Sequence, residues 1–431
     1  RNRPSILVWL DGSDNPPPAP IESTYVSILT EYGWPNPVLS SASGTRAQYS
    51  GPSGVKMSGP YDWVAPSYWL LDASHGGAFG FNTETSPGAA VPPAASIRRM
   101  LPDGDWWPMD SAWLFHAGGG QFANLKTFSD ALTARYGPPS GMDDYAEKAQ
   151  VMTYESERAM FEAYGRNRYV ATGVIQWMLE NGWPSMIWHL YDFFLRPGGG
   201  YFGAKKALEP VHVMYSYDDR SIAVINQTDS AVRGATVTAR VMGRDAMTLS
   251  VRDTTLDIPP DTVVRLASIP VPAGVTGAYF VELQLTRASQ VLISTNVYWL
   301  STEDDVLDLA KSTWYGTPMR AAANFTALEA LPTTTVVSSV RFERSGSREV
   351  ARVRLSNPGR AVAFFVTVRL EAGGSGDEIL PVLWRDNDVT LFPGESREIT
   401  ATVDAAALGG KRPVIAVSGW NVQEALARAG P

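Results

Sequence analysis

The chain has 431 residues, a formal net charge of −8 at pH 7 and no cysteine. This length exceeds what one hydrophobic core usually supports and predicts two or three domains, while the acidic balance argues against a nucleic-acid partner, because phosphate binding needs clustered Lys and Arg. The four histidines lack metal-ligand spacing, no cofactor is implied, and no apolar run is long enough to span a membrane. The absence of cysteine excludes thiol chemistry and is compatible with an extracellular or periplasmic bacterial protein.

Strand-like and helix-like segments alternate in the first half of the chain, which predicts an α/β domain. Residues 5–10, SILVWL, form an apolar run typical of a fully buried strand in a parallel sheet. The other expected strands are 37–43, 77–86 and 185–192, and helical spacing predicts helices over 23–33, 122–137 and 142–167. In the last of these helices, Glu155 and Glu157 are interpreted as part of a solvated face.

From Val211 onwards the pattern changes to short alternating runs that are broken by Asp, Asn, Gly and Pro. This texture is typical of a β-sandwich. It pauses over 301–332 and starts again near residue 333, so we expect two sandwiches of one type, acting as scaffold more than as catalyst. The predicted fold class is therefore α/β plus all-β.

Two of the expected strands end at a carboxylate. Asp14 follows the first strand, and Glu84 lies at the end of the third, where Pro87 and Gly88 mark a sharp turn. Because the carboxyl ends of parallel barrel strands gather at one rim, both side chains are expected at the same site. A pair of carboxyls on the two faces of a sugar is the requirement for cleaving a glycosidic bond.

Aromatic side chains are frequent around these two acids in the sequence. Their flat faces suit the C–H surfaces of sugars, but each of them could equally fill a hydrophobic core. The residues concerned are Trp63, Tyr68, Trp69, Trp177, Trp183, Trp188 and Tyr191.

Several blocks of the sequence resemble the exo-β-D-glucosaminidases of glycoside hydrolase family 2. They include LDGSDNPPP, GPSGVKMSGPYDWVAPSYWL, GGAFGFNTETSPG, ERAMFEAYGRN, ATGVIQWML, YFGAKKALEPVH, NVYWLST and LFPGES. The resemblance implies that residues 1–213 are the C-terminal part of a TIM (β/α)8 barrel, strands 4 to 8 only. It further implies immunoglobulin-like β-sandwich domains over 214–318 and 319–431.

The same resemblance implies the reaction. Asp14 would be the general acid/base and Glu84 the nucleophile of a retaining hydrolase that removes β-1,4-linked glucosamine from the non-reducing end of chitosan and chitooligosaccharides. Most family members carry Asn-Glu at the acid/base position, whereas this sequence has Ser13-Asp14, as the glucosaminidase subgroup does. The alternative is a β-mannosidase or an endo-β-mannosidase that acts on Manβ1-4GlcNAc of N-glycans. A carbohydrate-binding module without catalysis is a third reading.

Further substrate-binding residues are expected at the same rim. Trp188 matches a family tryptophan in the floor of the sugar site, and Tyr191, Asp192 and Tyr201 follow it closely, although Tyr201 could be only a loop anchor. Asp192 and Asp11 are candidates to neutralise the substrate amine, while Asp11 could equally be a solvated loop acid.

The resemblance also implies a partner. Arg1 would lie just before the fourth barrel strand, so we expect the N-terminal half of the enzyme, with a jelly-roll domain, a sandwich and the first barrel strands, to be supplied by a separate chain or a bound fragment. A half barrel would otherwise leave strand edges and an apolar face open to water.

Overall fold

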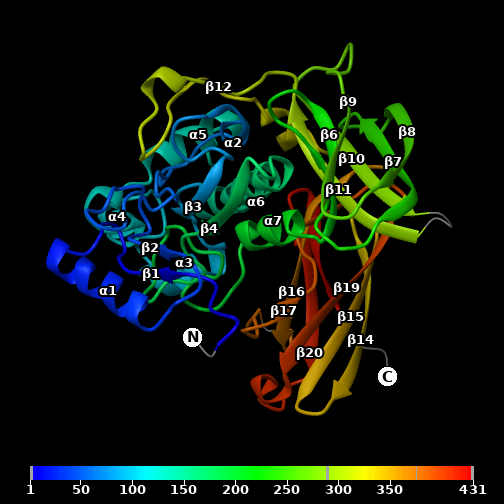
Figure 1. Ribbon diagram of the computed structural model, residues 1–431. Coiled ribbons are helices and arrows are strands. Elements are labelled where there is room, and N and C mark those ends of the chain that lie inside the picture. Colours follow the sequence, from blue (N-terminus) through cyan, green and yellow to red (C-terminus); the bar gives the residue numbers. More distant parts are fainter. Residues whose placement is uncertain (1–2, 288–290, 375, 429–431) are drawn as a thin grey trace.

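The computed structural model describes residues 3–287, 291–374 and 376–428. A helical region comes first in the chain, and two regions of antiparallel sheet follow it (Figure 1). The helices of the described part are too short or too polar to cross a membrane.

The helical region carries short strands that alternate with helices. β1 and β2 pair in parallel, and so do β3 and β4, so the expected parallel arrangement is present as two separate pairs. Its elements are β1 (Trp9–Leu10), α1 (Ala19–Glu31), β2 (Val38–Leu39), α2 (Tyr68–Leu71), β3 (Gly80–Thr85), α3 (Ala94–Met100), α4 (Ser111–Ala117), the one-turn η1 (Gly120–Phe122), α5 (Lys126–Tyr136), α6 (Met142–Arg166), β4 (Ala171–Gln176) and α7 (Gly199–Ala207).

Three of the expected strands differ from the structure, and the one expected over 37–43 is reduced to Val38–Leu39. Residues 5–10 were expected to be a buried strand, but only Trp9 and Leu10 are in strand conformation, and Leu7 is 72% exposed. The physical reason is that β1 pairs on one side only, with β2, and nothing in the described part of the chain covers its other edge. Residues 185–192 form isolated bridges in place of a strand, whereas β4 is a strand that the sequence pattern did not indicate.

α6 is the central helix of the molecule, and it matches the predicted helix closely. The prediction that Glu155 and Glu157 form a solvated face is wrong, because they are 1% and 3% exposed. Glu155 pairs with Arg135 of α5, which also pairs with Asp305 beyond the first sandwich. The partners of these charges come from distant parts of the chain, so local spacing did not indicate that they are buried.

The first region of sheet contains two antiparallel sheets, of order β5-β6-β9 and β11-β10-β7-β8. β7 shows why such sheets form, because Val237, Ala239 and Val241 are buried and alternate with more polar residues. The strands are β5 (Val211–Tyr215), β6 (Ser221–Asn226), β7 (Val232–Met242), β8 (Thr248–Ile258), β9 (Thr262–Ser268), β10 (Ala278–Arg287) and β11 (Val291–Ser301).

The second region of sheet has the same construction, with sheets of order β14-β15-β19-β17 and β18-β16-β20-β21. Antiparallel sheets in pairs are consistent with the two predicted immunoglobulin-like sandwiches. The strands are β14 (Val337–Ser345), β15 (Arg348–Ser356), β16 (Ala363–Ala372), β17 (Leu383–Trp384), β18 (Val389–Leu391), β19 (Ser396–Asp404), β20 (Pro413–Gly419) and β21 (Val422–Ala427), with the one-turn η4 (Ala405–Leu408) after β19.

The segment between the two sandwiches, residues 302–332, is here called the linker. It runs from the first sandwich across the helical region near α5 (yellow in Figure 1) and then returns to the second sandwich. Its elements are β12 (Val306–Leu307), η2 (Leu309–Lys311), β13 (Met319–Ala321) and η3 (Thr326–Ala330).

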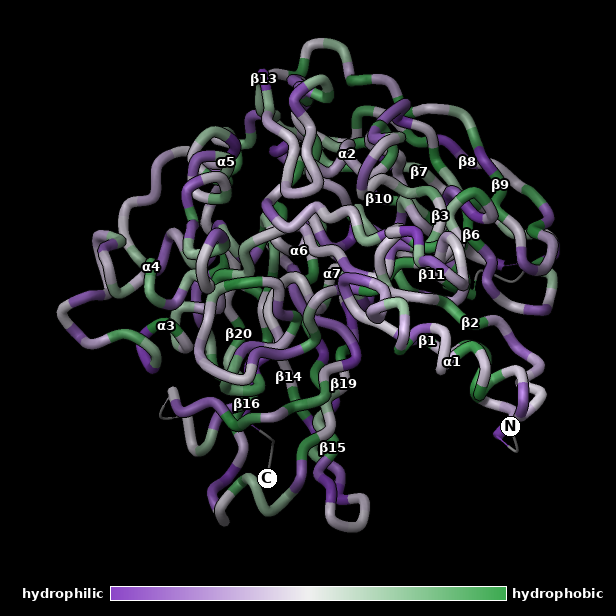
Figure 2. The backbone as a smooth tube through the Cα atoms, turned by 60° about the vertical axis from the view of Figure 1, so that its left-hand side comes forward, coloured by the Kyte–Doolittle hydropathy of each residue, from purple (hydrophilic) through white to green (hydrophobic). Residues whose placement is uncertain are grey.

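Apolar packing joins the three regions. Tyr154 of α6 contacts Trp299 of β11 at 5.9 Å and Phe365 of β16 at 5.7 Å between ring centroids. By contrast, β1, β2 and α1 lie at the edge of the molecule (Figure 2). The helical region is therefore anchored to both sandwiches through α6 and is least covered at its N-terminal edge.

Candidate active site

Glu84 lies near the end of β3, on a strand that is tightly fastened to the chain before it. The buried side chain of Asn82 donates to the carbonyl of Gly59 over 2.9 Å, and the Thr85 hydroxyl donates to the carbonyl of Pro60 over 3.1 Å. These bonds hold Tyr61 beside the strand, and its hydroxyl donates to Oε1 of Glu84 over 2.8 Å.

Asp14 lies in the turn that follows β1. The Ser13 hydroxyl donates to Oδ1 of Asp14 over 2.8 Å, and the backbone N–H of Ala42, after β2, donates to the carbonyl of Ser13 over 2.9 Å. A Cβ at Gly12 would clash with the carbonyls of Asn15 and Ser40, so this tight turn requires glycine. Asp14 is exposed and so accessible to a substrate.

Electrostatics link the two acids. Burial raises the pKa of Glu84, the hydrogen bond from Tyr61 opposes this rise, and the negative charge of Asp14 adds to it. The Asp14 charge also helps to raise the pKa of Tyr61, after burial and the contacts with Glu84. The structure thus brings together the two carboxyls that the sequence selected, with Tyr61 in contact with one and within the field of the other.

Aromatic rings surround Tyr61. Trp188, 8% exposed, donates its indole N–H to the Tyr61 carbonyl over 2.9 Å, and the two ring centroids are 5.6 Å apart. Phe122 packs on Trp188 at 4.7 Å, and Trp314 packs on Tyr61 at 5.5 Å with nearly half of its surface exposed. The structure therefore places Trp188 against Tyr61, the residue that binds Glu84.

Trp314 and Tyr315 belong to the linker, and the sequence interpretation missed them because it treated this segment as a pause between sandwiches. The carbonyl of Tyr315 accepts the backbone N–H groups of both Tyr61 and Asp62, each over 2.8 Å. A Cβ at Gly59 would clash with the carbonyl of Trp314, so the linker lies directly against this segment. The available signal was a pair of adjacent aromatic residues before a glycine in an otherwise polar connection.

The remaining predicted binding residues are Tyr191, Asp192 and Tyr201. Among the described residues, no hydrogen bond or ring contact joins them to Tyr61. The rings of Tyr191 and Tyr201 contact each other, with centroids 4.7 Å apart. Asp192 is 2% exposed and accepts the backbone N–H groups of Phe194 and Arg196, while its other oxygen accepts the Ser96 hydroxyl. These bonds hold the loop that leads into α7.

Asp11 is half-buried beside the Asp14 turn. Its Oδ2 is buried without a hydrogen-bond partner in the described part of the protein. Burial raises its pKa, and the charge of Glu22 adds to this rise. The reading of Asp11 as a freely solvated loop acid is therefore not the one that the structure supports.

The other aromatic residues divide between core and surface. Trp63, Tyr68 and Trp69 are at most 1% exposed and belong to the hydrophobic core, whereas Trp177 and Trp183 are 40% and 41% exposed. The described residues contain no group of three or more His, Cys, Asp or Glu side chains that could hold a metal ion.

Comparison with known proteins connects this geometry to a family. A family model described as the exo-beta-D-glucosaminidase Ig-fold domain matches residues 314–422, and the mannosidase Ig/CBM-like domain matches residues 218–302. An exo-beta-D-glucosaminidase of Streptomyces avermitilis is 41% identical, over 98% of this chain and 48% of that protein. A mannosylglycoprotein endo-beta-mannosidase of Lilium longiflorum is 25% identical over 98% of this chain.

Solved structures agree with the sequence relatives. The crystal structure of Amycolatopsis orientalis exo-chitosanase CsxA matches with a TM-score of 0.92 and 36% identity, over 98% of this chain and 51% of that one. Two further structures of CsxA, one with an aspartate and one with a glutamate replaced by alanine, are complexes with PNP-beta-D-glucosamine. The chain spans about half the length of these relatives, and over nearly all of its own length it is similar to exo-β-D-glucosaminidases.

Proposed function

We propose that this chain carries the catalytic carboxyls of a retaining exo-β-D-glucosaminidase. The observation that supports this most directly is the cluster of Asp14, Tyr61 and Glu84, in which two strand-end acids act on each other electrostatically beside an aromatic wall. The sequence identity of 36–41% with glucosaminidases over 98% of the chain supports the same substrate class.

In the proposed mechanism, an oxygen of Glu84 attacks the anomeric carbon of the terminal sugar while Asp14 gives its proton to the departing glycosidic oxygen. The C1–O bond to the leaving group breaks, and a glycosyl ester forms on Glu84. Asp14 then takes a proton from a water molecule, whose oxygen attacks C1 and displaces Glu84, so that the anomeric configuration is retained. The hydrogen bond from Tyr61 lowers the pKa of Glu84 against the effects of burial and of the Asp14 charge, and it thereby favours the ionised Glu84 that the first step requires.

The residues around the two carboxyls have separate roles in this proposal. Tyr61 orients Glu84 through its hydroxyl, and Ser13 orients Asp14 through the bond to Oδ1. Trp188 and Trp314 provide apolar faces for the sugar and its leaving group. Asp11, whose Oδ2 lacks a partner, is the more suitable acid for the substrate ammonium, because the oxygens of Asp192 are already engaged.

We also infer that the helical region is part of a (β/α)8 barrel completed by a further polypeptide segment. Apolar side chains are exposed in and next to two of the parallel strands. They are Leu7 and Leu10 at β1, and Val170 and Ile175 at β4. A continuous barrel would cover these edges. The relatives are about twice as long as this chain, which gives the missing segment a source.

Replacement of the two acids tests the proposed function. In the complete protein, Asp14→Ala and Glu84→Ala should each lower kcat on 4-nitrophenyl β-D-glucosaminide by roughly 10³-fold or more, because each removes a group needed in both steps. Asp103→Asn, at an exposed acid in another loop, is the matched control and should keep the original rate. Hydrolysis that survives both alanine changes would show that the catalytic residues lie elsewhere.

The mannosidase alternative is separated by substrate. The complete protein should release glucosamine from chitobiose and leave 4-nitrophenyl β-mannoside intact, because Ser13-Asp14 replaces the Asn-Glu pair that the mannosidases carry. Activity on the mannoside alone would exclude the glucosaminidase proposal while leaving the two carboxyls in their roles.

A further inference from the structure

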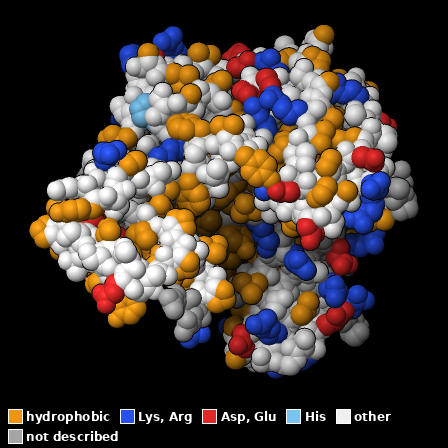
Figure 3. All heavy atoms as spheres, viewed as in Figure 1, with side chains coloured by type: hydrophobic (Ala, Val, Ile, Leu, Met, Phe, Trp, Pro, Cys, Tyr) orange, Lys and Arg blue, Asp and Glu red, His pale blue; other side chains and the backbone are white. Residues whose placement is uncertain are grey.

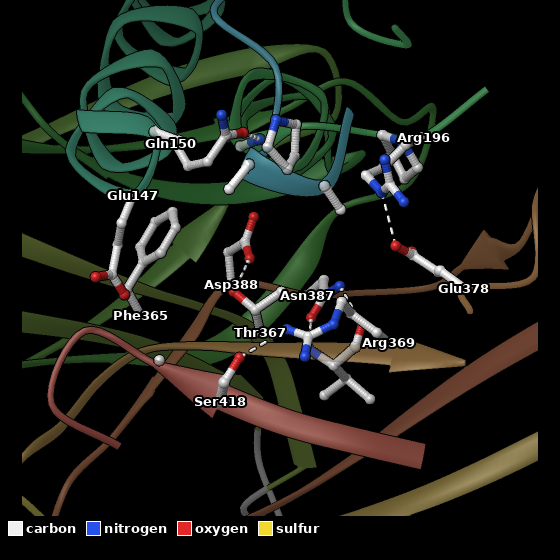
Figure 4. A pocket seen from close by; sticks show the side chains of 18 of the residues that line it. Glu147, Gln150, Arg196, Phe365, Thr367, Arg369, Glu378, Asn387, Asp388 and Ser418 are labelled. Atoms are coloured by element: carbon white, nitrogen blue, oxygen red, sulfur yellow. Dashed lines mark hydrogen bonds and ion pairs between the residues drawn. The ribbon is translucent and has the colours of Figure 1, made fainter. Parts of the chain in front are cut away.

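A cavity of about 450 Å³ lies between the helical region and the second sandwich (Figure 4). The start of α3, one side of α6 and the loop before α7 form one wall, and β16, β20 and the loop before β18 form the other. This volume is within the range of roughly 300–1,000 Å³ that is typical of sites for small molecules. A hollow lined by apolar side chains is visible between these two regions in the space-filling view (Figure 3).

The arginines of the cavity already have partners among its carboxylates. The ion pairs are Arg98–Asp143 at 2.5 Å, Arg196–Glu378 at 2.6 Å and Arg369–Glu424 at 2.5 Å. The cavity therefore does not offer a free positive charge to an anion from its described lining. The lining acids outnumber the lining arginines, which favours a cationic ligand.

Asp388 supplies the carboxylate that lacks a cation. It is 8% exposed, and its Oδ1 accepts the Thr367 hydroxyl over 2.8 Å. No side chain of the described residues binds its other oxygen, which points into the cavity (Figure 4). Burial raises the pKa of Asp388 to about 7, which is the expected cost of a buried carboxylate without a positive partner.

Glu147 of α6 is a second acid of this kind on the opposite wall. Burial, reinforced by the neighbouring acids Asp144 and Glu329, raises its pKa to about 7. The neighbouring Lys148 ammonium binds Asp144 and Glu329 instead. Two carboxyls without a cation thus face one cavity from two regions of the chain.

The rest of the lining is suited to a sugar ring. Ala94 and Pro197 are partly exposed and give the cavity apolar surface, and the buried Phe365 lies next to Glu147 in the close view. Phe365 is held at a positive φ of 51°, a conformation that bulky residues rarely adopt and that is concentrated at functional sites. An ammonium group, hydroxyls and an apolar ring face together define an amino sugar.

We propose that this cavity is a second carbohydrate site that holds one glucosamine unit, with the ammonium of the sugar paired to Asp388 and one face of its ring on Ala94 and Pro197. The choice of glucosamine rests on the proposed function, because that reaction supplies the sugar both as a free product and as the end of a chain. The site is separate from the Asp14–Glu84 pair, since no lining residue of the cavity is shared with that cluster.

Calorimetric titration of the complete protein carrying Glu84→Gln, which prevents hydrolysis, tests this proposal. Glucosamine and chitobiose should each bind at two sites per protein, and N-acetylglucosamine, which has no ammonium, should not bind at the second. Adding Asp388→Asn should weaken the second site by about 10-fold or more, because it removes the charged partner of the ammonium. Adding Asp103→Asn, at an exposed acid outside the cavity, should leave the second site unchanged.

Several results would overturn the proposal. A single glucosamine site in the Glu84→Gln protein, equal binding of N-acetylglucosamine at the second site, or a second site that is insensitive to Asp388→Asn would each do so. If Asp388→Asn unfolds the protein, the comparison of glucosamine with N-acetylglucosamine in the Glu84→Gln protein replaces it, and equal binding of the two sugars at the second site would equally refute the proposal.

The outcome can be separated from that of the proposed function. With Glu84 intact, Asp388→Asn should hydrolyse 4-nitrophenyl β-D-glucosaminide at the original rate, because the carboxyls of the active site are untouched. A protein without glucosaminidase activity that still binds glucosamine through Asp388 would refute the proposed function alone. An active protein with one glucosamine site would refute the second site alone.

Discussion

At the scale of single residues, Tyr61 connects the parts of the candidate active site. Its hydroxyl donates to Glu84, its carbonyl accepts the indole N–H of Trp188, and its backbone N–H donates to the carbonyl of Tyr315. All of its polar groups are thus used within one site. The sequence indicated Glu84 and Trp188, but a tyrosine in a loop of many aromatic residues carries no local signal of this role.

Replacing Tyr61 by phenylalanine should shift the pH dependence of catalysis. The Tyr61 hydrogen bond lowers the pKa of Glu84, whereas burial and the Asp14 charge raise it. Without the hydroxyl the pKa of Glu84 rises further, and since attack requires the ionised carboxylate, activity is lost at a higher pH on the acid side. We expect the acid limb of kcat/KM to move up by about one pH unit.

The control for this measurement is Tyr315→Phe. The Tyr315 hydroxyl lies 3.5 Å from the carbonyl of Gln121 and does not bind Glu84, so its removal should leave the acid limb in place. Equal pH profiles for Tyr61→Phe and the unaltered protein would contradict the assigned role of Tyr61.

At the scale of elements, α6 shows where prediction from sequence succeeds and where it stops. Its length follows from helical periodicity, which depends only on neighbouring residues. The burial of its charges depends on partners far along the chain, such as His212 and Asn296, which contact Glu162 over 2.8 Å each. The local pattern of charged residues therefore predicted that these side chains face solvent, whereas in the structure they are buried.

Glu157 of α6 provides a stability test. Burial alone raises its pKa well above the ordinary value, and its Oε2 has no partner in the described structure. Below about pH 4.5 the Glu157 carboxyl is neutral in both the folded and the unfolded protein. As the pH rises from there towards the pKa in the folded protein, only the unfolded protein ionises, and the free energy of unfolding falls by about 1.4 kcal/mol per pH unit. Glu157→Gln should remove this loss, matching the unaltered protein at pH 4 and exceeding its free energy of unfolding at pH 7.

The contrasting variant is Glu155→Gln in the same helix. Glu155 pairs with Arg135, which is 0% exposed, so its neutralisation leaves a buried cation short of one partner. We expect a loss of about 3 kcal/mol or more. Urea denaturation from pH 4 to 8 measures both variants, and a pH-dependent loss in Glu157→Gln equal to that of the unaltered protein would contradict the first expectation.

The linker contacts the candidate active site, which its sequence pattern did not indicate. Trp314→Ala in the complete protein should lower kcat/KM on glucosamine oligosaccharides by roughly 10-fold, because it removes the ring packed on Tyr61 and an exposed face for the sugar. Trp314→Phe should retain most of the activity. Leu309→Ala, at another exposed apolar residue of the linker, is the control, and an effect equal to that of Trp314→Ala would point to a general loosening of the linker.

At the scale of the whole molecule, the alternation of apolar and polar residues in the second half of the chain predicted paired antiparallel sheets. Within each strand this alternation shows which face is buried. No comparable local pattern shows whether the strands of a barrel form a closed sheet. Closure depends on strands that pair across the whole circle, and the described chain holds only two parallel pairs. The apolar run over 5–10 predicted a buried strand, but Leu7, Trp9 and Leu10 are exposed in the described structure.

The exposed apolar edges lead to a prediction about the isolated chain. Residues 1–431 produced alone should self-associate and lack hydrolase activity, whereas production together with the segment equivalent to the remaining half of the relatives should give a stable, active complex. Light scattering and release of 4-nitrophenol measure the two properties. A monomeric and fully active isolated chain would contradict the proposal of a completed barrel.

The carbonyl of Tyr315 carries a lesson for engineering of such enzymes. It accepts two backbone N–H groups from the loop that presents Tyr61, so the helical region and the linker depend on each other and cannot be exchanged separately. A chimaera that exchanges the linker together with the sandwiches would lose the Tyr315 carbonyl that holds this loop and the Trp314 ring that packs on Tyr61.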